Sequence, residues 1–371
     1  MNGKIRLAGT RFQIKGDMVA ATPYGNGHIN DTYKVTYRQT DRFVLYLFQQ
    51  INRQVFKDPF SLMDNVDRVC THLQHKYKLA NDSHTDSSRC ALTLIRTHDN
   101  RPCFEDSTGA VWRVYHFIEG ATSHNIVQNT QQAFTIANIF GEFQKLLMDL
   151  PGNRLNNTIP DFHNTPKRYK DLESSVAKDP FNRAAEAKKE IRFALEHKEL
   201  AGGLIAPYHD GRIPERISHN DAKLNNVLLS DGTQKALCII DLDTVMPGLS
   251  LYDFGDLLRS ATSPVAEDEP DLSKVTMQLP MFEALADGYL SSAGCFLTEI
   301  EKIMLPLSGK VITFEIGIRF LTDFLNGDVY FKTHHKQHNL NRCRTQFRLI
   351  ESMIEQEEAM NRIVEKLKTK R

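Results

Sequence analysis

The sequence predicts an α+β protein of two lobes, in which a small β-rich lobe precedes a large and mostly helical lobe. Its 371 residues exceed what one hydrophobic core usually organises. Residues 1–118 carry short runs that alternate apolar and polar side chains, which is typical of half-buried strands. From residue 119 onward, apolar residues recur mostly at helical spacing. We therefore expect domains at 1–118 and 119–371, with a short joint at 117–120.

The first lobe is expected to be a sheet accompanied by one helix. Leu62, Val66, Val69 and Leu73 recur at helical spacing and predict a helix at 60–76. Glycines at the turn after the first strand favour a tight connection to the second. The expected strands lie at 18–24, 32–37, 43–48, near 92–97 and near 111–117.

The second lobe is expected to be helical apart from one strand–loop–strand unit. Phe134, Phe140 and Leu147 lie on one broad apolar face that Pro151 ends. The segment Tyr252–Asp256 is interpreted as a turn that supports the fold. The expected elements are helices at 125–150 and 168–198, a strand–loop–strand unit at 215–241, and mostly helix from about 276 onward.

Composition argues against several classes of partner. Lys+Arg and Asp+Glu both number 46, so the net charge is zero and gives no long-range attraction for nucleic acid or an anionic membrane. We expect neither export nor membrane insertion, because no apolar stretch is long enough. The six cysteines form no CxxC pair, which favours a reducing cytoplasm. A helix expected at 346–368 would pack on its own lobe or on a second subunit, so monomer and homodimer both stay open.

The strongest chemical signal is a polar loop between two apolar strands. Segment 217–229 reads ISHNDAKLNNVLL and presents Asp221, Lys223 and Asn226 close together, and the next apolar strand ends at Asp241. Phosphoryl transfer needs one carboxylate to position the attacking hydroxyl and take its proton. It also needs oxygen ligands, such as an amide and a second carboxylate, to hold Mg²⁺ against the triphosphate. The pattern therefore predicts Mg²⁺-dependent phosphoryl transfer.

These residues resemble the catalytic core of the protein-kinase-like fold, in which HxDxxxxN is followed by an apolar strand and Asp. The residues of this motif are most similar to those of the aminoglycoside phosphotransferase and choline kinase family. Within that family, further details resemble the N-acetylhexosamine 1-kinases over about residues 17–350. Those details are YGNGHIN at 24–30, QQIN at 49–52, DLDTVMPG at 241–248 and GDVYFK at 327–332.

The resemblance implies a role for each matching residue. Asp221 would be the catalytic base, and Lys223 would stabilise charge near the γ-phosphate. Asn226 and Asp241 would hold Mg²⁺, with Asp243 as a further candidate metal ligand. The turn that covers the phosphates of ATP would consist of Gly25, Asn26 and Gly27, although this pattern alone equally fits a hairpin turn. The joint that reads the nucleotide base would consist of Phe117, Ile118 and Glu119.

One departure from the family pattern concerns the third strand. Related kinases place a cation there for the α- and β-phosphates, whereas segment 43–50 has none. Gln50 is the candidate for this position, and an amide donates hydrogen bonds without charge. Lys34 is a candidate substitute cation. A non-catalytic, nucleotide-binding pseudokinase is therefore an alternative, against which the intact Asp221 and Asn226 argue.

The acceptor is expected to be an uncharged sugar. Cationic acceptors such as choline call for acidic or aromatic cages, whereas a sugar calls for several hydrogen-bonding groups. The resemblance implies transfer to the anomeric hydroxyl of N-acetylglucosamine or N-acetylgalactosamine. The same fold also leaves homoserine, choline, ethanolamine or an aminoglycoside as alternatives. The candidate sugar-binding residues are His28, Asn30, His163, Arg168, Asp328, Tyr330 and Arg342.

Overall fold

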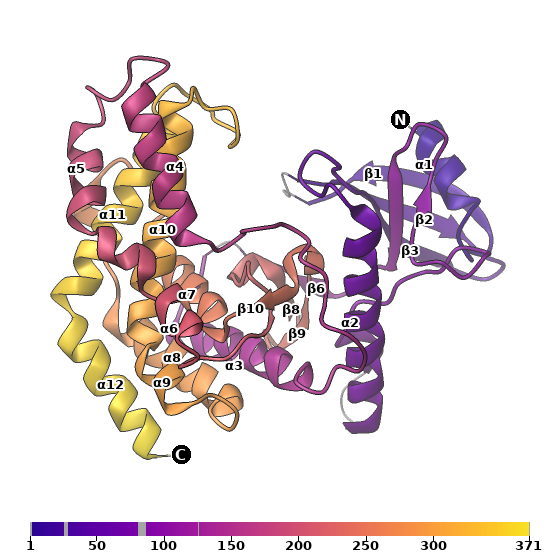
Figure 1. Ribbon diagram of the computed structural model, residues 1–371. Coiled ribbons are helices and arrows are strands. Elements are labelled where there is room, and N and C mark those ends of the chain that lie inside the picture. The colour runs from indigo at the N-terminus through magenta and orange to yellow at the C-terminus, as the bar shows by residue number, and fades with distance from the viewer. Residues whose placement is uncertain (1, 26–28, 81–86, 125, 371) are drawn as a thin grey trace. The chain divides into compact units, whose positions relative to one another are not determined.

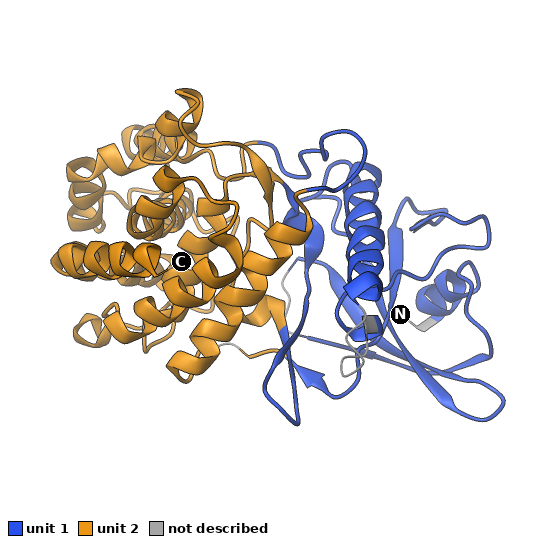
Figure 2. Ribbon diagram, turned by 90° about the horizontal axis from the view of Figure 1, so that it is seen from below, with its two compact units in different colours: residues 1–122, 149–160, 228–246 blue, residues 123–148, 161–227, 247–371 orange. Residues whose placement is uncertain are grey.

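The computed structural model describes residues 2–25, 29–80, 87–124 and 126–370 (Figure 1). Its chain divides into two compact units, which Figure 2 colours blue and orange. Unit 1 comprises residues 1–122, 149–160 and 228–246, and unit 2 comprises residues 123–148, 161–227 and 247–371. The units are thus discontinuous in sequence, whereas the sequence predicted one boundary after residue 118.

Unit 1 is built on a five-stranded antiparallel sheet with the strand order β1-β2-β3-β5-β4. Every residue of β2 pairs with β3, so that Lys34 lies opposite Leu47 and Asp31 opposite Gln50. On its other edge β3 pairs with β5, which brings Gln49 opposite Arg113. The elements are α1 (Asn2–Gly9), β1 (Asp17–Pro23), β2 (Asp31–Arg38), β3 (Phe43–Gln50), α2 (Pro59–Ala80), η1 (Ser87–Arg89), β4 (Phe104–Glu105) and β5 (Val111–His116).

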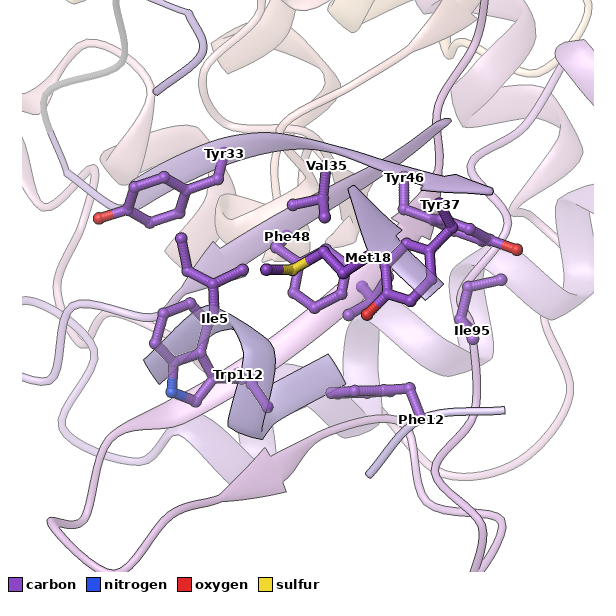
Figure 3. Packing of buried hydrophobic residues seen from close by; sticks show 12 residues of the cluster. Ile5, Phe12, Met18, Tyr33, Val35, Tyr37, Tyr46, Phe48, Ile95 and Trp112 are labelled. Atoms are coloured by element: carbon purple, nitrogen blue, oxygen red, sulfur yellow. The ribbon is translucent and has the colours of Figure 1, made fainter. Parts of the chain in front are cut away.

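A hydrophobic core lies against this sheet, as Figure 3 shows. Val35 and Phe48 project from neighbouring strands and are fully buried, and Trp112 joins them from β5. Ile5 comes from α1, a helix that the sequence analysis did not predict, and packs into the same cluster. Burying each such large side chain stabilises the fold by about 1.5–3 kcal/mol. This core fixes the strands that carry Lys34, Gln50 and Arg113.

A second small sheet of unit 1 has the strand order β6-β8-β9. A short connection over 231–235 joins β8 and β9, and a hydrogen bond from Ser230 N to Lys235 O (2.9 Å) closes it. Such a short connection makes a hairpin, so the chain leaves β9 at the end where it entered β8. Asp241 follows β9 directly after Ile240. The elements are β6 (Ala121–Thr122), β8 (Val227–Ser230), β9 (Ala236–Ile239) and η4 (Leu242–Thr244).

Unit 2 is mostly helical and packs around α10, which contacts α4, α7 and α11. A second helix pair, α3 and α8, approaches closely at Gly288, where a Cβ atom would lie 2.2 Å from the carbonyl oxygen of Phe134. The longer helices are α3 (Thr130–Leu146), α4 (Thr165–Lys178), α5 (Lys188–Glu196), α7 (Ser250–Ala261), α8 (Leu279–Ala293), α10 (Leu305–Leu325), α11 (His338–Glu355) and α12 (Glu357–Thr369). Shorter elements are η2 (Lys198–Gly202), α6 (Ile205–His209), β7 (Arg216–Ser218), η3 (Leu224–Asn226), η5 (Leu272–Lys274) and α9 (Glu299–Ile303), and β10 (Met246–Gly248) crosses the unit boundary.

The predicted fold class is confirmed, because a small antiparallel sheet lobe is followed by a mostly helical lobe. Several predicted elements are wrong in detail. The strand expected near 92–97 forms only isolated bridges, including one between Leu94 and Tyr115. The helix expected at 168–198 is interrupted after Lys178, where Asp179 adopts a left-handed backbone (φ 35°) and precedes Pro180. The turn expected at 252–256 lies inside helix α7.

Candidate active site

Unit 2 holds a polar loop that joins β7 to η3 and presents Asp221. Lys223 Nζ lies 2.9 Å from Asp221 Oδ1. Asn226 Nδ2 donates to the backbone oxygen of Asp221 (2.8 Å) and to its Oδ2 (3.0 Å). Burial alone would raise the pKa of Asp221, but the charge and hydrogen bond of Lys223 hold that pKa below its usual range. The carboxylate is therefore ionised and able to accept a proton.

Asp253 on α7 holds this loop from one side. Its Oδ2 accepts the backbone N–H of His219 (2.9 Å), and its Oδ1 accepts that of Asn220 (2.7 Å). The backbone of Asn220 is left-handed (φ 64°), which positions the peptide that leads into Asp221. Burial raises the pKa of Asp253 against the lowering effect of His219 and these N–H groups. The segment Tyr252–Asp256 was expected to support the fold, and these hydrogen bonds of Asp253 provide that support.

His163 lies in unit 2 with Glu315 and Asn220, and it is almost fully buried. Its Nδ1 lies 2.8 Å from Glu315 Oε1, and its Nε2 lies 2.9 Å from the backbone oxygen of Asn220. Thr165 Oγ1 donates to the other carboxylate oxygen of Glu315 (2.6 Å). Both ring nitrogens of His163 are therefore engaged, so a direct contact through them with a sugar would require breaking one of these bonds.

Unit 1 holds the second group of predicted residues, around the end of β9. Asp241 is exposed and has a left-handed backbone (φ 60°). Asp243 is buried, and its carboxylate is paired with the guanidinium of Arg113. Asn30 Nδ2 donates to Asp243 Oδ2 (2.6 Å), and Thr158 Oγ1 donates to the backbone oxygen of Asp243 (2.8 Å). Asp243 as a metal ligand and Asn30 as a sugar ligand stay predictions, and both side chains have partners within unit 1.

Arg113 is a residue that the sequence analysis missed. Its side chain is 1% exposed, and its Nε donates to Gln49 Oε1 (2.9 Å). Burial would lower the pKa of Arg113, but the charge of Asp243 outweighs burial and raises it. An arginine inside the apolar strand VWRVYH was the available signal, because a buried cation requires a carboxylate partner. Gln50 lies on β3 opposite Trp112 and stays the candidate for the position where relatives carry a cation.

The predicted base-reading joint lines a cavity of about 660 Å³ in unit 1. Arg89 donates to the backbone oxygens of Glu119 (2.6 Å) and Gly120 (3.2 Å), so these carbonyls already have a donor. Lys34 Nζ lies 4.9 Å from the ring centroid of Phe117. Tyr24 packs edge-on against the same ring, with 5.3 Å between the centroids. The lining residues are Gln74, Lys78, Ser88, Arg89, Thr93, His116, Phe117, Ile118 and Glu119.

Two arginines and several aromatic rings gather in unit 2 near the predicted sugar residues. The guanidinium carbon of Arg319 on α10 lies 5.8 Å from the ring centroids of Phe162 and Tyr330. Burial lowers the pKa of Arg168, and the nearby charge of Arg319 lowers it further. Arg168 Nε is buried without a hydrogen-bond partner. Arg319 was not predicted as a site residue, because only the tertiary fold brings α10 beside Phe162.

The segment that carries Tyr330 is held by Asp323. Its carboxylate accepts the backbone N–H groups of Val329 (3.0 Å), Tyr330 (2.8 Å) and Phe331 (3.0 Å). Asp328, a predicted sugar residue, is paired with Arg183. Tyr330 itself is largely exposed, at 59%. The carboxylate of Asp328 also accepts from Asn339 (2.9 Å).

Arg342 donates to the backbone oxygen of Lys332 (3.2 Å) and lies over the ring of Phe320. Gly25 has a left-handed backbone (φ 78°) with nothing within 4 Å of its Cβ position. Asn26, Gly27 and His28 lie outside the described residues, so the turn over the phosphates stays a prediction.

The donor chemistry of the predicted metal residues fits Mg²⁺. Because Asn226 Nδ2 is engaged by Asp221, its Oδ1 is the atom left for a cation. Asp241 adds an exposed carboxylate. Mg²⁺ commonly takes one or two protein oxygens and completes its shell with phosphates and water. Among the described residues, no cluster of three or more His, Cys, Asp or Glu side chains could hold a metal ion.

Within the described part of the chain, no helix combines the length and the apolar character needed to cross a bilayer.

The fold and the loop around Asp221 define a kinase-like phosphotransferase. A family model described as the phosphotransferase enzyme family, APH, matches residues 20–287. The chain therefore belongs to the APH phosphotransferase family, as its motifs indicated.

Solved structures of similar fold extend over almost the whole chain. A microcompartment-associated aminopropanol kinase matches with a TM-score of 0.59 and 14% identity, covering 97% of this chain and 99% of the other. Spectinomycin phosphotransferase, solved with ADP and spectinomycin, matches with a TM-score of 0.55 and 12% identity, covering 96% and 98%. An ethanolamine kinase of Plasmodium vivax matches with a TM-score of 0.55 and 15% identity, covering 88% and 82%. At such low identity, these similarities establish the shared fold.

Proposed function

We propose that this phosphotransferase moves the γ-phosphate of ATP onto the anomeric hydroxyl of N-acetylglucosamine or N-acetylgalactosamine, giving the sugar 1-phosphate and ADP. The observation that carries the proposal is the arrangement of Asp221, Lys223 and Asn226. Phosphoryl transfer uses three groups that this loop supplies. They are the ionised carboxylate of Asp221, the ammonium of Lys223 at 2.9 Å from it, and the side-chain oxygen of Asn226, whose Nδ2 donates to Asp221.

The reaction assigns each group one task. The sugar hydroxyl loses its proton to a carboxylate oxygen of Asp221 as its oxygen bonds to the γ-phosphorus. The bond between the γ-phosphorus and the β,γ-bridging oxygen breaks, and ADP leaves with the bond's electron pair. Lys223 stabilises the charge on the transferred group. Asn226 and Asp241 would hold Mg²⁺, which neutralises phosphate charge when bound.

The proposal requires Asn226 and Asp241 to hold the same metal ion. Chain connectivity supports this requirement. Asn226 is the residue directly before β8, and Asp241 follows β9 after one intervening residue. Since β8 and β9 form a hairpin, the chain returns to the end of that hairpin at which it entered.

The choice of an uncharged acceptor is supported by Arg168 and Arg319. Among the described residues, neither guanidinium lies within 4.0 Å of a carboxylate, and Arg168 Nε has no hydrogen-bond acceptor. The charge of Glu315 acts on both arginines, but Glu315 is already paired with His163, so a net positive charge remains that would repel choline, ethanolamine or an aminoglycoside. They would instead donate hydrogen bonds to the hydroxyl and acetamido oxygens of an N-acetylated sugar. Tyr330, largely exposed beside Arg319, offers an apolar face and a hydroxyl to the same ligand.

A panel of acceptors tests this choice. The full chain is incubated with ATP and Mg²⁺ and, separately, with N-acetylglucosamine, N-acetylgalactosamine, glucose, homoserine, ethanolamine, choline and an aminoglycoside. Acceptor-dependent ADP release is measured, and the product is identified by ³¹P NMR. We expect a sugar 1-phosphate with the two N-acetylated sugars. Faster turnover with an amino alcohol or an aminoglycoside would reject the sugar assignment while retaining the kinase.

The pseudokinase alternative predicts a different outcome. In that case Mg²⁺-ATP would raise the melting temperature of the protein, because binding to the folded state stabilises it, yet no acceptor would release ADP. The intact Asp221–Asn226 contact favours the catalytic alternative.

A further inference from the structure

His163 is joined to the loop of Asp221 by a hydrogen-bonded chain inside unit 2. Its Nε2 contacts the backbone oxygen of Asn220 at 2.9 Å, and Asn220 directly precedes Asp221. Its Nδ1 contacts Glu315 Oε1 at 2.8 Å, and both side chains are buried. A backbone carbonyl can only accept a hydrogen bond, so Nε2 must carry a proton. An ionised Glu315 also only accepts, so Nδ1 must carry one as well.

The surroundings of His163 favour this doubly protonated ring. Burial alone would lower its pKa, but the charge and hydrogen bond of Glu315 raise it above the ordinary value, and the Asn220 carbonyl and Asp256 add to this effect. Tyr252 on α7 packs against the ring, with 4.6 Å between the centroids. Arg319 on α10 and Arg168 on α4 are further cations whose charges act together with that of Glu315. Burial would raise the pKa of Glu315, but the charge of His163 outweighs it and lowers that pKa.

The backbone around Asn220 is thus held from two sides. Asp253 accepts the N–H groups of His219 and Asn220, while His163 donates to the carbonyl of Asn220. Asn220 is in the left-handed region (φ 64°), which few residues other than glycine adopt and which asparagine tolerates best among them. The carbonyl that His163 holds belongs to the peptide bond that leads directly into Asp221. The direction of this peptide sets where the side chain of Asp221 begins.

We propose that His163, oriented by Glu315, is a positioning residue that fixes the peptide between Asn220 and Asp221 and thereby the carboxylate that receives the acceptor's proton. This inference rests on the proposed catalytic role of Asp221. It gives His163 a different task from the sugar contact expected from the sequence.

Two substitutions of His163 distinguish its hydrogen bond to Asn220 from a role in packing alone. The amide nitrogen of glutamine reaches about as far as histidine Nε2, so H163Q keeps a donor for the Asn220 carbonyl. The shorter H163N places its amide near the former Nδ1, so it keeps a donor for Glu315 and loses the bond to Asn220. Misplacing a catalytic group by about 1 Å costs on the order of 100-fold in rate. We expect kcat to fall about 10- to 100-fold in H163N and less than about 5-fold in H163Q, with KM for the acceptor nearly unchanged in both.

A matched control is His338, another buried histidine paired with a carboxylate, whose Nε2 lies 3.0 Å from Asp268 Oδ2. H338N should alter melting temperature without the selective loss of kcat. Equal kcat values in folded H163N and H163Q would overturn the proposal. A rise in acceptor KM at constant kcat in H163N would also overturn it, because that result indicates direct sugar binding.

A pH profile gives a second and independent test should H163N fail to fold. In the wild type, loss of one imidazole proton leaves a single N–H for two acceptors, so kcat should decline at alkaline pH. In E315Q the amide can donate to Nδ1 of a neutral ring whose Nε2–H still reaches Asn220, so this decline should disappear. An alkaline decline that is the same in E315Q and the wild type would overturn the proposal.

Amide hydrogen exchange separates failure of this inference from failure of the proposed function. Exchange at residues 219–222 needs no substrate. It should quicken in H163N relative to H163Q, whatever acceptor the enzyme uses. Absence of sugar phosphorylation with this exchange difference present would reject the sugar while keeping the positioning role. Equal exchange in the two variants would reject the positioning role itself.

Discussion

The guanidinium of Arg113 is paired with the carboxylate of Asp243 in the buried interior of unit 1. Arg113 comes from the middle of β5, whereas Asp243 lies in the short helix that follows β9. The pair ties the two sheets of unit 1 together next to Asp241. Gln49, its neighbour on β3, accepts a further bond from Arg113. Strand β3, on which the family resemblance led us to expect a cation, has none, and the adjacent strand β5 carries the buried Arg113.

Removing Arg113 should destabilise the protein strongly. R113M leaves the carboxylate of Asp243 buried without its charge partner, which typically costs about 3–5 kcal/mol of unfolding free energy. The double variant R113M/D243N should recover part of this loss, because no charge is then left unpaired. Urea unfolding measures both. The control is R212A, whose partner Asp210 is exposed, and which should cost less than about 1 kcal/mol. A similar small loss in R113M would contradict the assigned role of the pair.

Asp221→Asn should remove most turnover while the fold survives. The amide keeps the shape of the carboxylate but cannot take the hydroxyl proton, and general-base catalysis contributes about 10²- to 10⁴-fold. We expect kcat to fall by this factor, with little change in the melting temperature. D210N, at an exposed carboxylate, serves as the matched control. Near-normal kcat in D221N would remove the catalytic role from this residue.

How far the sequence predicts this site depends on chain distance. Asp221, Lys223 and Asn226 lie within one loop, so their spacing alone indicated a common location, and their contacts are local. His163 and Asp253 support the same loop from distant segments. The sequence around either residue does not indicate this role. It depends on the packing of α7, which carries Asp253, and of α10, which carries the Glu315 that contacts His163.

The same distinction applies to secondary structure. The strand β2 was predictable because its alternation matches a half-buried pattern, with Val35 fully buried. The segment 92–97 contains apolar residues but joins the sheet only through isolated bridges, which local pattern does not separate from a strand. By contrast, Pro180 directly after Asp179 was a visible signal that the helix predicted at 168–198 had to end.

Gly248→Ala should impair catalysis through the loop. An added Cβ would lie 2.5 Å from Asn220 Oδ1, so the Asn220 side chain would have to move. Because Asn220 adjoins Asp221, we expect kcat to fall several-fold, with a modest loss of stability. Gly202→Ala is the control, since nothing lies within 4 Å of its Cβ position. Steady-state kinetics and thermal melting report both effects. Equal kcat in the two variants would show that the Asn220 side chain tolerates displacement.

Lys34→Met tests whether this lysine replaces the cation absent from the third strand. Its ammonium lies over the ring of Phe117, one of the residues predicted to read the nucleotide base. If Lys34 contacts the phosphates, K34M should raise KM for ATP about 10-fold and leave KM for the sugar unchanged. Lys57→Met, at an exposed lysine, is the control. An unchanged KM for ATP would show that Lys34 does not bind the phosphates, which would then be held by the metal ion and backbone groups.

The stability of the protein should depend on pH through His163 and Glu315. The pKa of His163 is raised in the folded state, so its contribution is fully present below the unfolded value of about 6.5 and is lost as pH rises through the folded pKa. The difference in unfolding free energy between the wild type and E315Q should therefore shrink at alkaline pH. Urea unfolding in steps from pH 6 to pH 10 measures this difference. E301Q is the control, because Glu301 is paired with Arg216, and arginine does not titrate in this range. The difference in unfolding free energy between the wild type and E301Q should therefore not change with pH. If the difference in unfolding free energy between the wild type and E315Q is also independent of pH, His163 does not lose a proton over this range. An alkaline decline of kcat would then have to come from the titration of another group.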